Sequence, residues 1–322
     1  GLNALGVDDI LVVDNLAFGD KHLNLRGCKI RDYMDKREFL RFVMASKSFG
    51  RVDGILHQGA CSDTTKANGR YMMWNNFTYS KELLHYALAR GVPFVYASSA
   101  SVYGDSTVFK EDPPNERPLN VYAYSKALFD QYVRRFLPNS ESTLVGLRYF
   151  NVYGPNEWHK GHMASVVYQC YMQLKQSGVV RLFGSSHGCA AGEQRRDFIF
   201  VDDVVRVNLF FVTGRRRVGI FNVGTGYARS FNEVARAVID CLGYGSIEYV
   251  PFPKGLRSRY QAYTQADLTS LRGAGYEGEF APLEEGVTRA VAAWEAELIS
   301  GLPEGVWGEL RGTRAAPRNG RA

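Results

Sequence analysis

The stretch PFVYASSASVYG, residues 93–104, joins a short apolar run to a group of serines. An apolar run of this length closed by small polar residues is typical of a buried strand in a parallel sheet. The stretch NVYAYSK, residues 120–126, then places Tyr122 and Lys126 one turn apart on a predicted helix, residues 122–136. Serine hydroxyls at the end of a strand, followed by this helix, predict an α/β fold with polar chemistry at the edge of its sheet.

The surrounding segments repeat the same alternation. Further strands are predicted at residues 9–14, 52–57 and 144–150, and further helices at 38–44 and 79–90. Strands that alternate with helices predict a parallel sheet covered on both faces. The expected fold class is therefore α/β, with a Rossmann-type doubly wound parallel sheet.

The second half of the chain suggests a smaller α/β domain. Helices are predicted at residues 164–176, 202–212, 230–243 and 283–298, with another opening at 264–267, and strands at 197–201 and 220–223. We assign residues 1–151 and about 197–225 to a cofactor-binding domain, and 152–196 and about 226–300 to a substrate-binding domain. Residues 301–322 are rich in Gly, Pro and Arg, and we predict a disordered tail there.

The composition narrows the class of protein. With 45% hydrophobic and 22% charged residues, no long apolar run and no export signal, the chain predicts a cytoplasmic protein without a membrane span. The net charge of +6 is spread along the chain, which favours an anionic small substrate over nucleic acid. The five cysteines are scattered, and His159 and His162 have no third ligand at a suitable spacing. We therefore expect reduced thiols and no metal.

Ser99, Tyr122 and Lys126 form the candidate catalytic set. A lysine one turn from a tyrosine is expected to lower the pKa of the phenol and to bind the ribose of a cofactor. Asp14 closes the strand at 9–14, where a carboxylate accepts hydrogen bonds from ribose hydroxyls of NAD or NADP. On its own, Asp14 is equally consistent with the start of a turn.

The remaining candidates surround that set. The loop at residues 57–62 has small side chains suited to close approach of a cofactor, and His57 is predicted to be a packed residue. Asn151 follows the strand at 144–150 and is expected to contact substrate. Arg196 and Tyr260 are expected to line a site for a nucleotide-sugar diphosphate.

Longer motifs resemble one branch of a known family. The segments ASSASVYG, PLNVYAYSK, RYFNVYGPNEWHKGHMAS, RRDFIFVDD and RYQAYTQADL closely resemble the heptose 6-epimerases of the extended short-chain dehydrogenase/reductase family, over about Leu2–Trp294. The resemblance implies that bound NADP, with NAD as the alternative, oxidises C6 of the heptose of an ADP-heptose to a ketone and returns the hydride to the opposite face. It also implies a homo-oligomer that supplies heptose for the inner core of lipopolysaccharide.

The resemblance also implies roles for individual residues. Tyr122 and Lys160 would be the two acid/base groups, one on each face, with Lys126 on the ribose and Ser99 beside the reacting oxygen. The implied cofactor residues are Asp14, Asn15, Lys21, Lys36, Gln58, Gly59, Ala60, Cys61, Ser62, Asn75, Lys126, Val152 and Lys160. The implied substrate residues are Asn151, His162, Gln169, Phe183, Gly184, Ser185, Ser186, Arg196 and Tyr260.

This sequence departs from the family pattern at several places. Gln58, His162 and Gln169 stand where the family often has Glu, Ser and His, and residues 187–192 form a Gly- and Ala-rich insertion. The first strand and its Gly-rich loop have no counterpart, so we expect that the chain begins inside the first helix. We therefore expect weak NADP binding or poor folding, and retention of the cofactor through gel filtration would refute this.

Three alternatives are weighed against this interpretation. A nucleotide-sugar 4,6-dehydratase would have an acidic pair where Ala100 and Ser101 stand. A 4-epimerase of UDP-sugars would share Ser99 and Tyr122 but would not account for Lys160. An inactive fragment would retain only part of the cofactor site.

Overall fold

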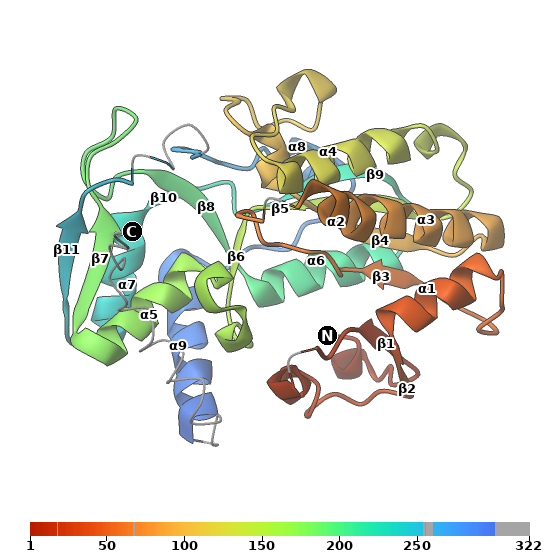
Figure 1. Cartoon of the computed structure of the whole chain (residues 1–322), viewed down its shortest axis with the longest axis horizontal. Helices are drawn as coiled ribbons and strands as arrows, with labels where there is room; N and C mark the ends of the chain where they lie inside the picture. The colour runs from red at the N-terminus through yellow and green to blue at the C-terminus, as the bar shows by residue number, and fades with distance from the viewer. Residues whose placement is uncertain (18, 67, 254, 256–259, 300–322) are drawn as a thin grey trace, which may run out of the picture.

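A four-stranded parallel sheet forms the centre of the computed structural model, which describes residues 1–17, 19–66, 68–253, 255 and 260–299. Its order is β3 (Ile55–His57), β4 (Phe94–Ser99), β5 (Leu144–Tyr149) and β9 (Val218–Val223). Figure 1 shows α2 (Gly69–Met73), α3 (Tyr79–Arg90) and α4 (Val121–Arg134) over one face, and α6 (Val201–Thr213) under the other. The α/β class with helices on both faces is confirmed.

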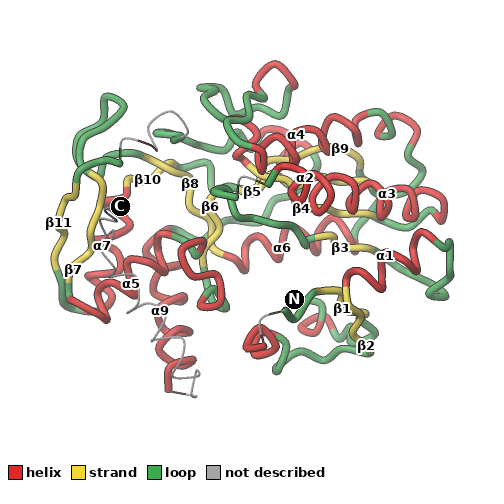
Figure 2. The backbone as a smooth tube through the Cα atoms, in the orientation of Figure 1, coloured by secondary structure: helices red, strands yellow, loops and turns green. Residues whose placement is uncertain are grey.

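A second parallel pair lies next to this sheet. Strands β1 (Leu11–Asp14) and β2 (Asp32–Asp35) pair with each other and lead into α1 (Lys36–Met44). Leu11 and Val13 pack against the same apolar cluster as α1 and α3, which includes the fully buried Leu84. Burial of these apolar side chains holds the pair against the cluster. Figure 2 shows β1 and β2 beside α1.

The second half of the chain forms a separate group of small sheets and helices. β6 (Asn151–Tyr153), β8 (Arg195–Phe200) and β10 (Ala228–Ser230) make one sheet, and β7 (Val179–Phe183) pairs with β11 (Ser246–Val250). The helices α5 (Val166–Ser177), α7 (Phe231–Leu242) and α9 (Leu283–Ile299) share one apolar cluster around the buried Trp294. The division of the chain into two domains remains a prediction.

Most predicted helices are observed within a few residues of the expected bounds. The capping box at Ser230 and Glu233 opens α7 as predicted. The helix predicted to open at 264–267 is wrong: α8 spans Thr269–Gly273. The amide of Thr264 instead donates to the carbonyl oxygen of Arg195 at 3.1 Å, which keeps this segment extended beside β8. The predicted tail, residues 301–322, lies outside the described residues.

Five of the observed strands were not predicted: β2, β6, β7, β10 and β11. These strands have three to five residues, and most carry exposed polar side chains that obscure the alternation. Their pairing depends on partners that are distant in the sequence. In the part of the chain that the structure describes, no helix has both the length and the apolar character needed to cross a bilayer.

Candidate active site

The carboxyl end of β4 and the first turn of α4 bring the predicted catalytic residues together. Asn120 caps α4, because its side chain accepts a hydrogen bond from the amide of Ala123 at 2.9 Å. This cap places Tyr122 in the first turn, where its side chain forms a hydrogen bond with Ser99 at the end of β4. Two residues from different elements therefore present adjacent hydroxyls at the edge of the sheet.

Lys126 is buried one turn further along α4. Its ammonium donates to the carbonyl oxygen of Ala97 at 2.7 Å, and only 4% of the residue is exposed. Burial lowers the pKa of Lys126 to about 8, while the charge of Asp130 acts in the opposite direction. The lysine is thus held between the helix and β4, and it releases its proton at a lower pH than an exposed lysine does.

The predicted lowering of the Tyr122 pKa by Lys126 is not observed. Burial raises the pKa of Tyr122, and the hydrogen bond with Ser99 is the contribution that lowers it. The reason is that desolvation of the phenolate dominates, whereas the Lys126 ammonium is directed at a backbone carbonyl.

A chain of hydrogen bonds connects the predicted cofactor residues to α4. The ammonium of Lys36 donates to Asn75 at 2.7 Å, and Asn75 donates to the side chain of Asn76 at 3.1 Å. Asn76 donates to the hydroxyl of Ser125 and accepts from the amide of Cys61. The two asparagines lie in a π-helical segment, Trp74–Thr78, and such segments occur frequently at functional sites.

Asp14 and Lys21 form an ion pair at the end of β1. Their Oδ1 and Nζ atoms are 2.6 Å apart, and the amide of Asn15 donates to the same oxygen at 2.7 Å. The second carboxylate oxygen of Asp14, Oδ2, takes part in neither of these two bonds. The arrangement fits an acceptor for ribose hydroxyls with a cation beside it.

Gln58 is anchored to residues that sequence reasoning missed. Its side chain accepts from the hydroxyl of Tyr149 at 2.8 Å and donates to Asn208 at 3.0 Å. His57, before it, is buried and bonded to Ser80, and burial lowers its pKa to about 3. His57 is therefore the packed, neutral residue that was predicted.

The loop after β6 carries the second predicted acid/base residue. Glu157 is buried and accepts hydrogen bonds from the amide of Gly154 and from the amide and hydroxyl of Ser165. These bonds fix both ends of the turn Trp158–Met163, which holds Lys160. Sequence reasoning did not single out Glu157, because its role depends on burial.

Lys160 lies near His162 and Gln169, two residues at which this sequence differs from the family pattern, and the three side chains have different surroundings. Lys160 is exposed, and in the described part of the chain no hydrogen bond or ion pair joins it to Tyr122 or Ser99. Burial lowers the pKa of His159, and the charges of Lys160 and Lys21 add to that effect. The side chains of His159 and Asn24 are 3.1 Å apart, so the loop lies alongside the segment that follows β1. Gln169 donates to the carbonyl oxygens of His162 and Ala164 and so closes the loop from α5.

The predicted substrate residues of the second half also converge. The guanidinium of Arg196 lies 4.9 Å from the ring centroid of Tyr260, and the Tyr260 ring is 6.5 Å from that of Phe183. Arg196 is 7% exposed, and burial lowers its pKa. Ser186 is buried as well and accepts from Gln194 at 2.9 Å. A buried cation among rings suits the diphosphate and base of a nucleotide.

The other predicted residues lie near these groups without such contacts. Gly184 donates its amide to the carbonyl oxygen of Val250 at 2.7 Å, and Ser185 is exposed beside it. Asn151 is exposed at the start of β6, and Val152 is partly buried in the same strand. Gly59, Ala60 and Ser62 lie in the loop after β3 and leave its backbone accessible.

A buried charge network under β4 was not predicted. Asp130 accepts from Arg148 at 2.9 Å and from the hydroxyls of Tyr96 and Ser98 at 3.0 and 2.8 Å. Arg148 also pairs with Glu116. A network of this kind ties α4, β4 and β5 together directly beneath Lys126, and its partners are too far apart in sequence to be recognised from spacing.

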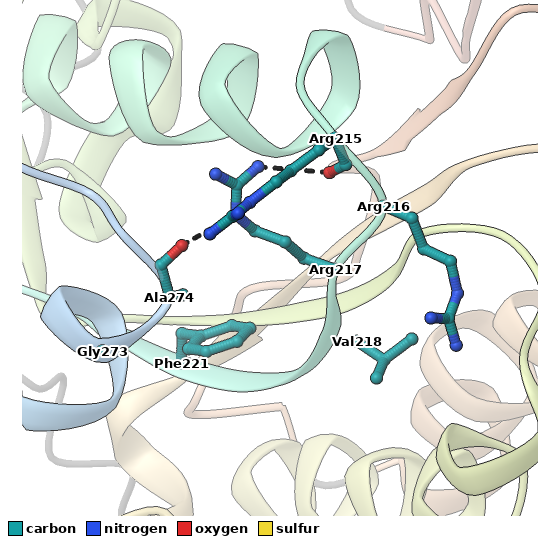
Figure 3. Close-up of a pocket in the computed structure, with 7 residues that line it drawn as sticks. All are labelled: Arg215, Arg216, Arg217, Val218, Phe221, Gly273 and Ala274. Carbon is teal, nitrogen blue, oxygen red and sulfur yellow. Dashed lines mark hydrogen bonds between the residues drawn. The ribbon is translucent and has the colours of Figure 1, made fainter.

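A basic pocket of about 400 Å³ lies elsewhere, around Arg215, Arg216 and Arg217 (Figure 3). Arg217 precedes β9 and donates to the carbonyl oxygen of Ala274 at 2.8 Å. The pocket is therefore at the amino end of the parallel strands, whereas the predicted catalytic residues are at the carboxyl end. Ligands of doubly wound sheets bind at the carboxyl end, so this pocket is not the candidate site.

Known proteins resemble this chain along most of its length. Residues 2–224 match the NAD dependent epimerase/dehydratase family. The chain is 56% identical over 286 residues to the ADP-L-glycero-D-manno-heptose-6-epimerase of Alkalilimnicola ehrlichii, with 89% of each chain covered.

Solved structures of epimerases also resemble this chain along most of its length. The crystal structure of Helicobacter pylori ADP-L-glycero-D-manno-heptose-6-epimerase has a TM-score of 0.78 and 31% identity, covering 89% of this chain and 88% of that one. The complex of Thermus thermophilus UDP-glucose 4-epimerase with NAD has a TM-score of 0.73 and 25% identity, covering 91% and 93%.

Proposed function

Because the chain belongs to the NAD dependent epimerase/dehydratase family, we propose that it inverts C6 of the heptose of ADP-D-glycero-β-D-manno-heptose to give ADP-L-glycero-β-D-manno-heptose. The observation that carries this proposal is the 56% identity, over 89% of both chains, to a protein named for that product. The pairing of Ser99 with Tyr122 beside Lys126 supports it, since these groups can move a proton at an alcohol.

The residues around Asp14 fit a dinucleotide cofactor. Asp14 offers a carboxylate oxygen to the ribose next to the adenine, and Lys21 and Lys36 place ammonium groups near it. Two cations beside that ribose favour a 2′-phosphate, so we propose NADP rather than NAD. The nicotinamide, when bound, accepts a hydride and returns it, which is the redox chemistry that no side chain supplies.

Tyr122 is proposed to take the proton from the C6 hydroxyl during oxidation. Ser99 would hold the same oxygen, because its hydroxyl already bonds to Tyr122. The buried ammonium of Lys126 would hold the nicotinamide ribose and favour the phenolate once a ligand displaces the carbonyl oxygen of Ala97. These three residues serve one face of the substrate.

Lys160 is proposed to serve the other face. In the proposed reaction the ketone turns over before the hydride returns to its other face, so its oxygen would then meet a second proton donor, while Tyr122 would serve the first orientation. The exposed position of Lys160 on an anchored turn allows its side chain to reach a bound sugar. We also propose that the protein is a cytoplasmic homo-oligomer whose product supplies lipopolysaccharide synthesis.

The direct test is to supply the protein with ADP-D-glycero-β-D-manno-heptose and NADP and follow the heptose signals by NMR. We expect conversion to the L-glycero epimer with no net change in NADP absorbance. Parallel reactions with UDP-glucose and dTDP-glucose test the 4-epimerase and the 4,6-dehydratase. Turnover of either, with none of the heptose, would overturn the proposal.

A further inference from the structure

Residues 186–189 form a tight hairpin with an unusual residue at its tip. Ser186 and Cys189 exchange backbone hydrogen bonds of 3.1 and 2.9 Å across a two-residue turn. The turn residues His187 and Gly188 have φ angles of +53° and +76°. Positive φ at both positions is the hairpin geometry that favours Asn or Gly. Histidine tolerates positive φ but is less usual than Asn or Gly at such a turn, so the contacts of its ring are the informative feature.

The His187 ring packs on one side of an aromatic cluster, formed by Phe183, His187, Phe252 and Tyr260. Its centroid is 5.4 Å from that of Phe252 and 5.7 Å from that of Tyr260. Phe252 in turn lies 5.1 Å from both Phe183 and Tyr260. The rings of Phe252 and Tyr260, both from the loop after β11, therefore meet the imidazole at ordinary aromatic distances, and Phe183 of β7 packs against these two rings.

The aromatic cluster adjoins the candidate active site. The residue after Tyr260, Gln261, donates to the carbonyl oxygen of Gly104 at 2.8 Å, in the segment that follows Ser99. Arg196 lies over the Tyr260 ring at 4.9 Å. Among the described residues no carboxylate pairs with Arg196. The protein thus places a buried cation between the catalytic edge and a group of rings.

The hydroxyls, the cation and the rings follow the order of the sugar, the diphosphate and the base in a nucleotide-sugar. The sugar would lie at Ser99 and Tyr122, the diphosphate at Arg196 and the flat base against the rings. Resting on the proposed function, we propose that His187 stacks on the adenine of the substrate and helps to select it. His187 lies in residues 187–192, where the sequence predicts an insertion, so on this proposal the stacking contact would be particular to this chain.

The test removes the imidazole ring of His187 and keeps the turn at residues 186–189 intact. His187→Asn keeps a residue that tolerates positive φ and removes the ring, and His187→Phe keeps a ring. Base stacking on a side chain corresponds to roughly 5- to 100-fold in affinity, so we expect His187→Asn to raise the KM for the ADP-heptose about tenfold at unchanged kcat. The dissociation constant of ADP, measured by calorimetry, should rise equally, and His187→Phe should restore both.

The controls separate this role from a structural one. Ala190→Ser changes an exposed residue of the same loop and should leave the KM, the ADP affinity and the melting temperature unchanged. A His187→Asn protein with wild-type KM and ADP affinity would overturn the inference, even if its melting temperature fell. So would failure of His187→Phe to restore binding. If wild-type protein binds ADP but does not epimerise the heptose, the proposed function fails while the ADP measurements still test His187.

Discussion

Arg148 donates from its Nε atom to the carboxylate of Asp130 across 2.9 Å, and neither side chain has any exposed surface. Asp130 lies two helical turns after Tyr122 and one turn after Lys126 on α4. A bonded ion pair inside the protein fixes both partners, because separating them would leave the Asp130 carboxylate as a buried charge without a cation. The relationship therefore sets the position of α4 against β4 and β5.

Asp130→Asn should destabilise the fold strongly. Removing one member of a buried pair costs about 3–5 kcal/mol, and Arg148 would then keep its charge with Glu116 as its remaining counter-ion. Urea denaturation measures the free energy of unfolding. The matched control is Asp53→Asn in the exposed pair with Arg51, where we expect no measurable change. Equal effects of the two substitutions would contradict the assignment of Asp130.

The stability of the protein should show the titration of Lys126. Burial lowers its pKa in the folded state from 10.5 to about 8. Below pH 8 both states carry the proton, and between pH 8 and 10.5 the unfolded state binds more protons. The Lys126 contribution to the free energy of unfolding should therefore rise with pH in that window, by about 3 kcal/mol.

Lys126→Met provides the reference for this measurement, since tyrosines with raised pKa values titrate at still higher pH. Urea denaturation of both proteins at pH 7, 8, 9 and 10 gives the difference in free energy of unfolding. A difference that stays constant over these values would show that the Lys126 pKa is not lowered.

Loss of either proposed acid/base group should abolish most activity. Tyr122→Phe and Lys160→Met should each lower kcat for the heptose by at least about 100-fold, the usual contribution of a positioned acid or base. Lys29→Met, at another exposed lysine, is the control and should keep wild-type kcat. Full activity of Lys160→Met would remove this residue from the mechanism and leave Tyr122 as the tested group.

Glu157→Gln should weaken the loop that carries Lys160. The amide keeps one acceptor oxygen, whereas the carboxylate now accepts three hydrogen bonds from Gly154 and Ser165. We expect a loss of about 1–3 kcal/mol in the free energy of unfolding and a lower kcat, with NADP affinity unchanged. Glu141→Gln, at an exposed carboxylate, should change none of these quantities.

Gly104→Ala should be far more disruptive than Gly91→Ala. Both glycines have positive φ, at +55° and +63°. A methyl group at position 104 would lie 1.5 Å from the carbonyl oxygen of Arg117, whereas position 91 has no neighbour within 4 Å. We expect about 1 kcal/mol at Gly91 from the backbone alone, and at least about 2 kcal/mol more at Gly104. Thermal or urea unfolding compares them directly.

Local patterns were sufficient for the long elements of the fold. The helix at 79–90, the capping box at Ser230 and the strand at 144–149 follow from periodicity and capping, which act within one or two turns. The candidate set of Ser99, Tyr122 and Lys126 was predicted for the same reason, since the end of a strand and the first turn of a helix can both be predicted from the local sequence. The short strands of the second half were missed because they pair over long sequence separations.

The amino-acid order alone was enough to predict an α/β fold and a candidate catalytic edge, because both rest on local spacing, and its longer motifs were enough to resemble the family to which the chain belongs. Tertiary structure decided the rest. Burial set the pKa of Lys126 and raised that of Tyr122, packing joined Arg148 to Asp130, and the hairpin at His187 met two rings of the loop after β11. Desolvation and long-range contact depend on which groups the folded chain removes from water together, and no local pattern records that.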